Sequence, residues 1–142
     1  MIFVDTGAWL ERDLAGREHR DLADRGWQEI DGGAFRVVTT DLVLSELATF
    51  MKRAGAPGPA SERAAGILAS KRVEVEPIAP EDRHLALRFF KKFRDQGGVT
   101  WCDCISFAIM RRLRIRRAFA FDGDFDRAGF ELWPERGRGQ RT

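Results

Sequence analysis

The sequence has 142 residues, 44% of them hydrophobic, which is enough for one domain with its own core. Its 24 Lys and Arg residues against 22 Asp and Glu residues give a net charge of +2, so overall charge selects no class of partner. The two cysteines, Cys102 and Cys104, flank one residue on a predicted helix, which excludes a disulfide framework and indicates a reducing compartment. No apolar run approaches the roughly 18 residues of a membrane span, and the first residues form a strand rather than a signal peptide. We therefore expect a cytoplasmic protein without membrane contacts.

Hydrophobic periodicity predicts strands that alternate with helices along the chain. We expect strands at 1–4, 35–38, 73–76, 118–121 and 130–133, and helices at 8–30, 42–53, 60–70, 81–95 and 100–110. Proline and glycine predict a surface loop at 55–59, and the basic tail 134–142 is expected to be disordered. This alternation predicts an α/β fold, with a central parallel sheet of about five strands and helices on both faces, as a single domain over 1–133.

Two of the apolar strands run directly into acidic residues. Segment 1–4 is followed by Asp5, and segment 118–121 is followed by Asp122, Gly123 and Asp124. In a parallel sheet both strands end at the same carboxyl edge. Carboxylates crowded at such an edge repel one another and are poorly solvated, so the site must take up a proton, a cationic side chain or a metal ion.

Two further acids lie beside apolar helix faces, and each also has a local explanation. Glu46 lies on the flank of the apolar stripe of helix 42–53, where a glutamate that touches solvent is common. Asp103 lies in the first turn of helix 100–110, which is apolar nearly all round. The spacing of Thr100 and Asp103 fits a capping box, which would satisfy both side chains structurally.

Together these acids form an oxygen-only ligand set without His or Cys at metal-binding spacing. Mg²⁺ or Mn²⁺ prefers such ligands, and one or two of these ions can orient a water for in-line displacement at phosphorus. The arginines at 111–117 complement the negative end of the preceding helix, and they could equally bind a polyanion. Arg112, Arg116 and Arg117 are the candidates for contacts with a nucleic-acid backbone.

Four segments resemble the acidic motifs of PIN-domain ribonucleases, in the order and spacing of that family. They are Val4–Trp9, Ser45–Leu47, Thr100–Ala108 and Phe121–Phe130. The resemblance is closest to the VapC-type toxins of bacterial toxin–antitoxin pairs, and it spans nearly the whole chain. It implies a PIN-like fold and a Mg²⁺-dependent endoribonuclease, usually dimeric, that a cognate antitoxin holds inactive.

The resemblance also implies roles for individual residues. Asp5, Glu46, Asp103 and Asp122 match the catalytic acids, Asp124 matches a frequent fifth acid, and Thr6 and Thr100 match hydroxyl positions near the site. On this interpretation the metal ion is held by Asp5, Asp103 and Asp122 with help from Asp124, while Glu46 positions or deprotonates the attacking water.

Three other functions compete with RNA hydrolysis. A receiver-like signalling module also collects acids around Mg²⁺ but needs a lysine after a late strand, and no lysine follows Lys92. A phosphatase would use an Asp-x-Asp motif, which Asp122 and Asp124 imitate, but that motif normally follows the first strand. A non-catalytic RNA-binding PIN scaffold would lack some of the acids, and this sequence has them all.

Overall fold

The fold is built around a five-stranded sheet, seen in a computed structural model that describes residues 1–137. The strands are β1 (Ile2–Val4), β2 (Val37–Thr39), β3 (Val73–Val75), β4 (Arg117–Phe119) and β5 (Glu131–Trp133). Their order is β3-β2-β1-β4-β5, and every neighbouring pair is parallel. Central β1 is fully buried, as expected for a strand with helices on both faces. The predicted α/β fold with a parallel sheet is confirmed.

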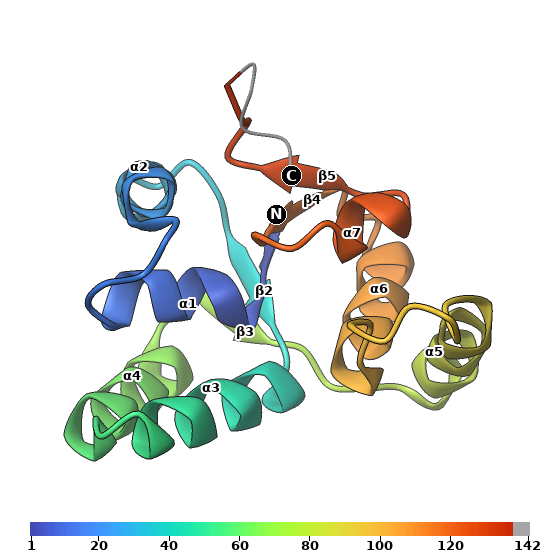
Figure 1. The fold of residues 1–142 in the computed structure, drawn as a ribbon, viewed down its shortest axis with the longest axis horizontal. Coiled ribbons are helices and arrows are strands. Elements are labelled where there is room, and N and C mark those ends of the chain that lie inside the picture. Colours follow the sequence, from blue (N-terminus) through green and yellow to red (C-terminus); the bar gives the residue numbers. More distant parts are fainter. Residues whose placement is uncertain (138–142) are drawn as a thin grey trace.

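Seven helices connect and cover these strands within the described residues (Figure 1). They are α1 (Thr6–Asp13), α2 (Arg20–Asp31), α3 (Asp41–Arg53), α4 (Pro57–Ala69), α5 (Pro80–Lys92), α6 (Trp101–Leu113) and α7 (Asp124–Arg127). In Figure 1, α1 and α2 lie to one side of the strands and α5, α6 and α7 to the other, while α3 and α4 form a hairpin beside α1. None of these helices is long and apolar enough to cross a membrane.

The strand order creates a crevice beside β1. The chain builds β1, β2 and β3 outward in one direction and then returns through α5 and α6 to place β4 on the other side of β1. The carboxyl ends of β1 and β4 therefore meet where the strand order reverses. In open α/β sheets such a switch point is where ligands bind.

Helix α6 packs into the core beside this point. Its residues from Asp103 to Met110 are all buried, as its apolar sequence predicts. Phe107, fully buried, meets the rings of Phe89, Phe125 and Phe130 at centroid distances of 5.0–5.9 Å. These edge and stacked contacts fix α6 against α5 and the turn after β4, because core side chains pack at crystal-like density.

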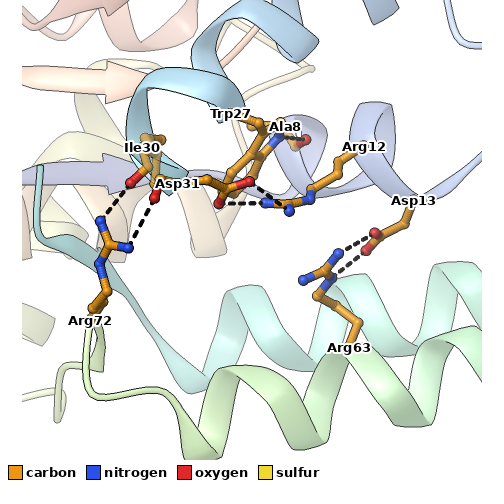
Figure 2. A network of polar contacts seen from close by, with 8 residues as sticks. All are labelled: Ala8, Arg12, Asp13, Trp27, Ile30, Asp31, Arg63 and Arg72. Carbon is orange, nitrogen blue, oxygen red and sulfur yellow. Dashed lines mark hydrogen bonds and ion pairs between the residues drawn. The ribbon is translucent and has the colours of Figure 1, made fainter. Parts of the chain in front are cut away.

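A polar network fastens the helices of the other face (Figure 2). Arg63 of α4 binds the carboxylate of Asp13 with two hydrogen bonds of 2.6 and 2.7 Å. Arg12 of α1 binds Asp31 of α2 in the same bidentate manner, at 2.9 and 3.2 Å. Three more hydrogen bonds complete the network: Trp27 donates to the carbonyl of Ala8, and Arg72 donates to the carbonyls of Ile30 and Asp31. The fork of an arginine matches a carboxylate, so these pairs fix orientation as well as proximity.

The prediction of one helix over 8–30 is wrong, because the chain leaves helical geometry at Leu14. Leu14 adopts an extended conformation, Gly16 has a φ of 73°, and a second helix begins only at Arg20. Glycine reaches positive φ without steric cost, so Gly16 allows the turn. The result is a short loop, residues 14–19, at the carboxyl edge of the sheet.

Two other predictions need correction. Helix α4 begins at Pro57, inside the expected loop, because proline is well placed at the first position of a helix. The pattern of helix 81–95 predicts that Phe90 faces the core together with Leu85, Phe89 and Phe93, but Phe90 is 44% exposed. Residues Leu85, Phe89 and Phe93 follow the helical period and pack inward, whereas Phe90 lies one residue off that stripe.

Part of the expected disordered tail is packed on the domain. Pro134 is buried, and a Cβ on Gly26 of α2 would lie only 2.8 Å from its ring. Arg136 donates hydrogen bonds to the carbonyls of Ala120 and Pro134. The rest of the predicted tail, residues 138–142, lies outside the described residues.

Candidate active site

A groove of about 670 Å³ opens at the carboxyl edge of the sheet. Six of the predicted site residues line it: Asp5, Thr6, Glu46, Thr100, Asp103 and Asp122. They come from separate parts of the chain, namely the end of β1, the start of α1, the middle of α3, the start of α6 and the turn after β4. The fold therefore brings together four acids that are up to 117 positions apart in the sequence.

Asp5 lies deepest of these acids, with only 6% of its surface exposed. Its backbone N–H donates to the carbonyl of Phe119, which ties the end of β1 to β4. Its side chain makes no capping hydrogen bond to α1, although it occupies the cap position. Burial raises the pKa of Asp5 well above its ordinary value, and the charges on Asp103 and Asp122 raise it further. An unbound carboxylate here is therefore unstable relative to its protonated or ion-bound form.

Asp103 serves as a helix cap and faces the groove at the same time. Its Oδ2 accepts from the backbone N–H of Thr100 at 2.8 Å, and Thr100 Oγ1 accepts from the N–H of Asp103 at 3.1 Å. This is the predicted capping box. Its other oxygen, Oδ1, has no hydrogen bond to any residue that the structure describes. Burial raises the pKa of Asp103 to about 6 despite the capping bonds, which lower it.

Glu46 reaches the groove from α3 and is held by a hydroxyl from α1. Thr6 Oγ1 donates to Glu46 Oε1 at 2.7 Å. The residue Glu46 is exposed and lines the groove, so water in the groove can reach its carboxylate. A carboxylate that is oriented by one hydrogen bond and open on the other side is suited to accept a proton from a bound water.

Asp122 and Asp124 share a tight turn but differ in surroundings. Asp122 Oδ1 accepts from the backbone N–H of Asp124 at 3.0 Å, and partial desolvation together with the charge on Asp124 raises the pKa of Asp122. Asp124 does not line the groove, and its Oδ1 accepts from Arg127 Nη1 at 2.7 Å. Asp124 is thus already paired with a cation, which leaves less of its carboxylate free for a metal ion.

The donor set fits a hard divalent ion that keeps part of its water shell. Within residues 1–137, no three acidic, histidine or cysteine side chains are gathered tightly enough to enclose an ion alone. Mg²⁺ is usually held by one or two carboxylates together with waters and phosphate oxygens, so an incomplete protein cage is consistent with it. The raised pKa values of Asp5, Asp103 and Asp122 indicate a place where positive charge is favoured.

The two cysteines near this groove are not suited to nucleophilic chemistry. Burial raises the pKa of Cys102 far above its usual value, and the charges on Glu46 and Asp5 add to that effect. Burial also raises the pKa of Cys104, to about 11. Both thiols stay protonated at neutral pH, and the thiolate is the reactive form.

The arginines predicted to contact a nucleic acid lie away from the groove. Arg112 binds buried Asp82 with two hydrogen bonds of 2.9 and 3.0 Å and also reaches Glu76, so it fastens α6 to α5. Arg117 begins β4, at the edge of the sheet opposite the acids, and pairs with Glu131 on β5 at 3.5 Å. Arg116 precedes it at the same edge. None of the three lines the groove, so their contact with a nucleic-acid backbone stays a prediction.

Sequence reasoning missed the groove residues contributed by the loop 14–19. Arg17 and His19 both line the groove. The predicted helix 8–30 would instead make His19 an ordinary solvated helix residue. The available signal was Gly16, which interrupts the helical pattern at 8–30. Phe121, the residue before Asp122, stacks flat against His19 with a centroid distance of 4.8 Å.

Comparison with known proteins agrees with this geometry. The family model described as PIN domain matches residues 2–131. The 23S rRNA-specific endonuclease VapC20 from two strains of Mycobacterium tuberculosis is 36% identical over 136 residues, covering 95% of this chain and all of that protein. The crystal structure of Mycobacterium tuberculosis VapC20, described as a sarcin-ricin loop cleaving toxin, superposes with a TM-score of 0.81 at 34% identity, covering 92% of this chain and 97% of that one. The resemblance to VapC-type PIN ribonucleases is confirmed, and the chain belongs to the PIN-domain family of nucleases.

Proposed function

We propose that this protein is a Mg²⁺-dependent endoribonuclease and the toxin of a VapBC-like toxin–antitoxin pair. The observation that carries the proposal is the groove itself, in which Asp5, Glu46, Asp103 and Asp122 converge from four separate elements. Three of these acids have raised pKa values, as expected where a cation belongs. The membership of the PIN-domain family, with no catalytic acid missing, supports catalysis over a purely RNA-binding role.

Each acid has a distinct part in the proposed reaction. Asp5, the free Oδ1 of Asp103 and Asp122 would hold the metal ion, and Asp124 would assist through the turn it shares with Asp122. Bound there, Mg²⁺ or Mn²⁺ would polarise the phosphodiester and lower the pKa of a water molecule. Glu46, oriented by Thr6, would take the proton from the attacking water. The water oxygen would form a bond to phosphorus while the bond from phosphorus to the leaving ribose oxygen breaks, and the leaving oxygen would take a proton from solvent water.

The described activity of VapC20 indicates the class of substrate. VapC20 is described as specific for 23S rRNA and as cleaving the sarcin-ricin loop. We propose an RNA substrate for this chain as well, with an unpaired segment that can enter the groove. We also propose that the protein works in the cytoplasm, as a homodimer or as a hetero-oligomer with a cognate antitoxin. The antitoxin would cover the groove and so hold the nuclease inactive.

The proposal is tested by incubating the purified protein with an RNA oligonucleotide that carries the sarcin-ricin loop, and separately with total RNA. We expect cleavage at defined positions with Mg²⁺ or Mn²⁺ and none in EDTA. Undiminished cleavage by metal-stripped protein would overturn the proposed mechanism, and failure to cut any RNA with metal present would overturn the proposed function.

A further inference from the structure

The acid groove has one wall of a different character, formed by the loop 14–19 and two phenylalanines. We call it the Arg17 wall and define it as Arg17, His19, Phe50 and Phe121, all of which line the groove. Among the described residues that line the groove, Arg17 is the only arginine or lysine. RNA carries a negative charge at every phosphate, so a groove otherwise lined by carboxylates needs such a cation to hold the backbone.

Buried Glu11 fixes the position of this wall. Glu11 is only 3% exposed, and its two oxygens hold two members of the loop 14–19. Its Oε2 accepts from the backbone N–H of His19 at 3.1 Å, and its Oε1 lies 3.5 Å from Arg17 Nε. A buried carboxylate requires such partners, so the loop is held in one arrangement rather than left to order on binding.

Arg17 retains unused capacity to bind an anion. Its Nε is buried and faces Glu11, but its two Nη groups make no hydrogen bond within the described residues, and its side chain is 33% exposed. The guanidinium lies over the ring of Phe50, with Cζ 5.7 Å from the ring centre. Stacking on an aromatic face holds the planar fork in place while its outer edge stays open, which is the arrangement that binds phosphate oxygens.

His19 and Phe121 form a flat stack next to the acids. Their rings are 4.8 Å apart with an interplanar angle of 2°, and the His19 side chain is 36% exposed. Phe121 directly precedes Asp122, so the stack lies beside the site of the proposed reaction. An exposed aromatic face backed by a second ring is a surface on which an unpaired base can stack.

We propose that the Arg17 wall binds one unpaired nucleotide adjacent to the scissile phosphate, with Arg17 on its phosphate and His19 against its base. This inference rests on the proposed ribonuclease function and names the part of the substrate that the groove holds. It makes Arg17 and His19 substrate-positioning residues rather than participants in the bond-breaking step. A base inside a duplex cannot reach His19, so the wall selects loops and single strands.

The test measures RNA binding without cleavage. A fluorescent oligonucleotide with the sarcin-ricin loop is titrated with Asp5→Asn protein in Mg²⁺, at several salt concentrations. Arg17→Gln should weaken binding about tenfold and reduce the slope of log K against log salt by about one, as the loss of one phosphate contact requires. Arg17→Lys should keep the slope. Arg88→Gln, on an exposed position of α5 outside the groove, is the matched control and should change neither quantity.

The contact between His19 and the base is tested by a separate set of binding measurements. His19→Ala should weaken binding about fivefold or more, the loss expected for one stacked base, without changing the salt slope, and His19→Phe should restore it. After the cleaved bond is mapped with active protein, an RNA that lacks the base beside it should bind parent and His19→Ala equally. In active protein, both Arg17→Gln and His19→Ala should raise KM more than they lower kcat.

The outcomes separate this inference from the proposed function. If the parent cleaves RNA and Arg17→Gln and His19→Ala both match Arg88→Gln in binding and salt slope, the Arg17 wall is not the nucleotide subsite. If the parent protein neither binds nor cleaves RNA with metal present, the proposed function fails and this inference fails with it.

Discussion

Thr6 and Glu46, which are 40 residues apart in the sequence, are joined by a hydrogen bond of 2.7 Å across the acid groove. Thr6 is the first residue of α1 and is 7% exposed, whereas Glu46 is an exposed residue in the middle of α3. The bond therefore connects the helix that follows β1 to the α3–α4 hairpin. It holds the exposed carboxylate of Glu46 in a fixed direction.

Thr6→Val should lower kcat for RNA cleavage about tenfold with little change in KM. The substitution keeps the shape of the side chain but removes a hydrogen bond to a charged group, which contributes roughly 1.5–3 kcal/mol. Thr6→Ser keeps the hydroxyl and should retain most of the activity. Equal loss in Thr6→Val and Thr6→Ser would indicate that packing of the threonine methyl, rather than the bond to Glu46, matters.

The stability of the metal-free protein should depend on Asp103. Its pKa rises from 3.8 to about 6 on folding, so the folded state binds the proton more tightly than the unfolded state. The associated stability is fully present below about pH 4 and is lost as pH rises through about 6, and the full shift corresponds to about 3 kcal/mol. Urea unfolding in EDTA between pH 4 and 8 should show this decline, and Asp103→Asn should flatten it.

Above pH 7 in EDTA, Asp103→Asn should be more stable than the parent by on the order of 1–2 kcal/mol. An asparagine oxygen can still accept from Thr100, so the loss is limited to the favourable charge at the helix start, about 0.3–1 kcal/mol. Mg²⁺ should stabilise the parent by mass action and the variant much less. A variant that is less stable in both buffers, with a parent that ignores Mg²⁺, would make Asp103 a helix cap and nothing more.

Gly26→Ala should destabilise the fold by about 1–3 kcal/mol. A Cβ there would lie 2.7 Å from the ring of Phe119 and 2.8 Å from that of Pro134, so α2 would have to move off β4. Gly66→Ala is the matched control, because an added Cβ at this exposed position of α4 meets nothing within 4 Å. It should be neutral or stabilise the helix by up to about 1 kcal/mol. Urea unfolding of the two variants measures the difference, and equal effects would show that α2 does not depend on this close approach.

Arg112→Gln should reduce stability by roughly 2 kcal/mol, because it leaves buried Asp82 without its ion-pair partner. The salt dependence of RNA binding should not change. Arg116→Gln, at an exposed position of the same cluster, should change stability by less than about 0.5 kcal/mol. A smaller slope of log K against log salt for Arg112→Gln would instead indicate that Arg112 contacts the RNA backbone.

The strand ends made much of the site predictable. Apolar runs that stop at Asp5 and Asp122 indicate the same sheet edge, because parallel strands must deliver their ends together. The spacing of Thr100 and Asp103 likewise predicted the capping box that the structure shows. Such features depend on local sequence and on the topology of the whole sheet, both of which can be read from the pattern.

The remaining features depend on tertiary contacts that periodicity does not encode. Arg17 and His19 reach the groove only because buried Glu11 holds their loop, and nothing in the spacing of these residues indicates that contact. Clustering in sequence likewise does not indicate the partner of Arg112, because Asp82 is 30 positions away. The role of a charged side chain depends on the side chains that it contacts, and the tertiary fold determines which these are.

The proposed function requires that acids from four separate elements act as one metal-binding catalytic site. Single-turnover cleavage of the sarcin-ricin loop RNA by Asp5→Asn, Asp103→Asn and the double variant tests it most directly, with Asp126→Asn, an exposed acid outside the groove, as the control. We predict that the cleavage rate of each single groove variant falls on the order of 100-fold or more, and that the control keeps the parent rate. The double variant should be no slower than either single variant, because the effects of residues that act as a unit are not additive. A double variant that cleaves within a few-fold of the parent would contradict the account.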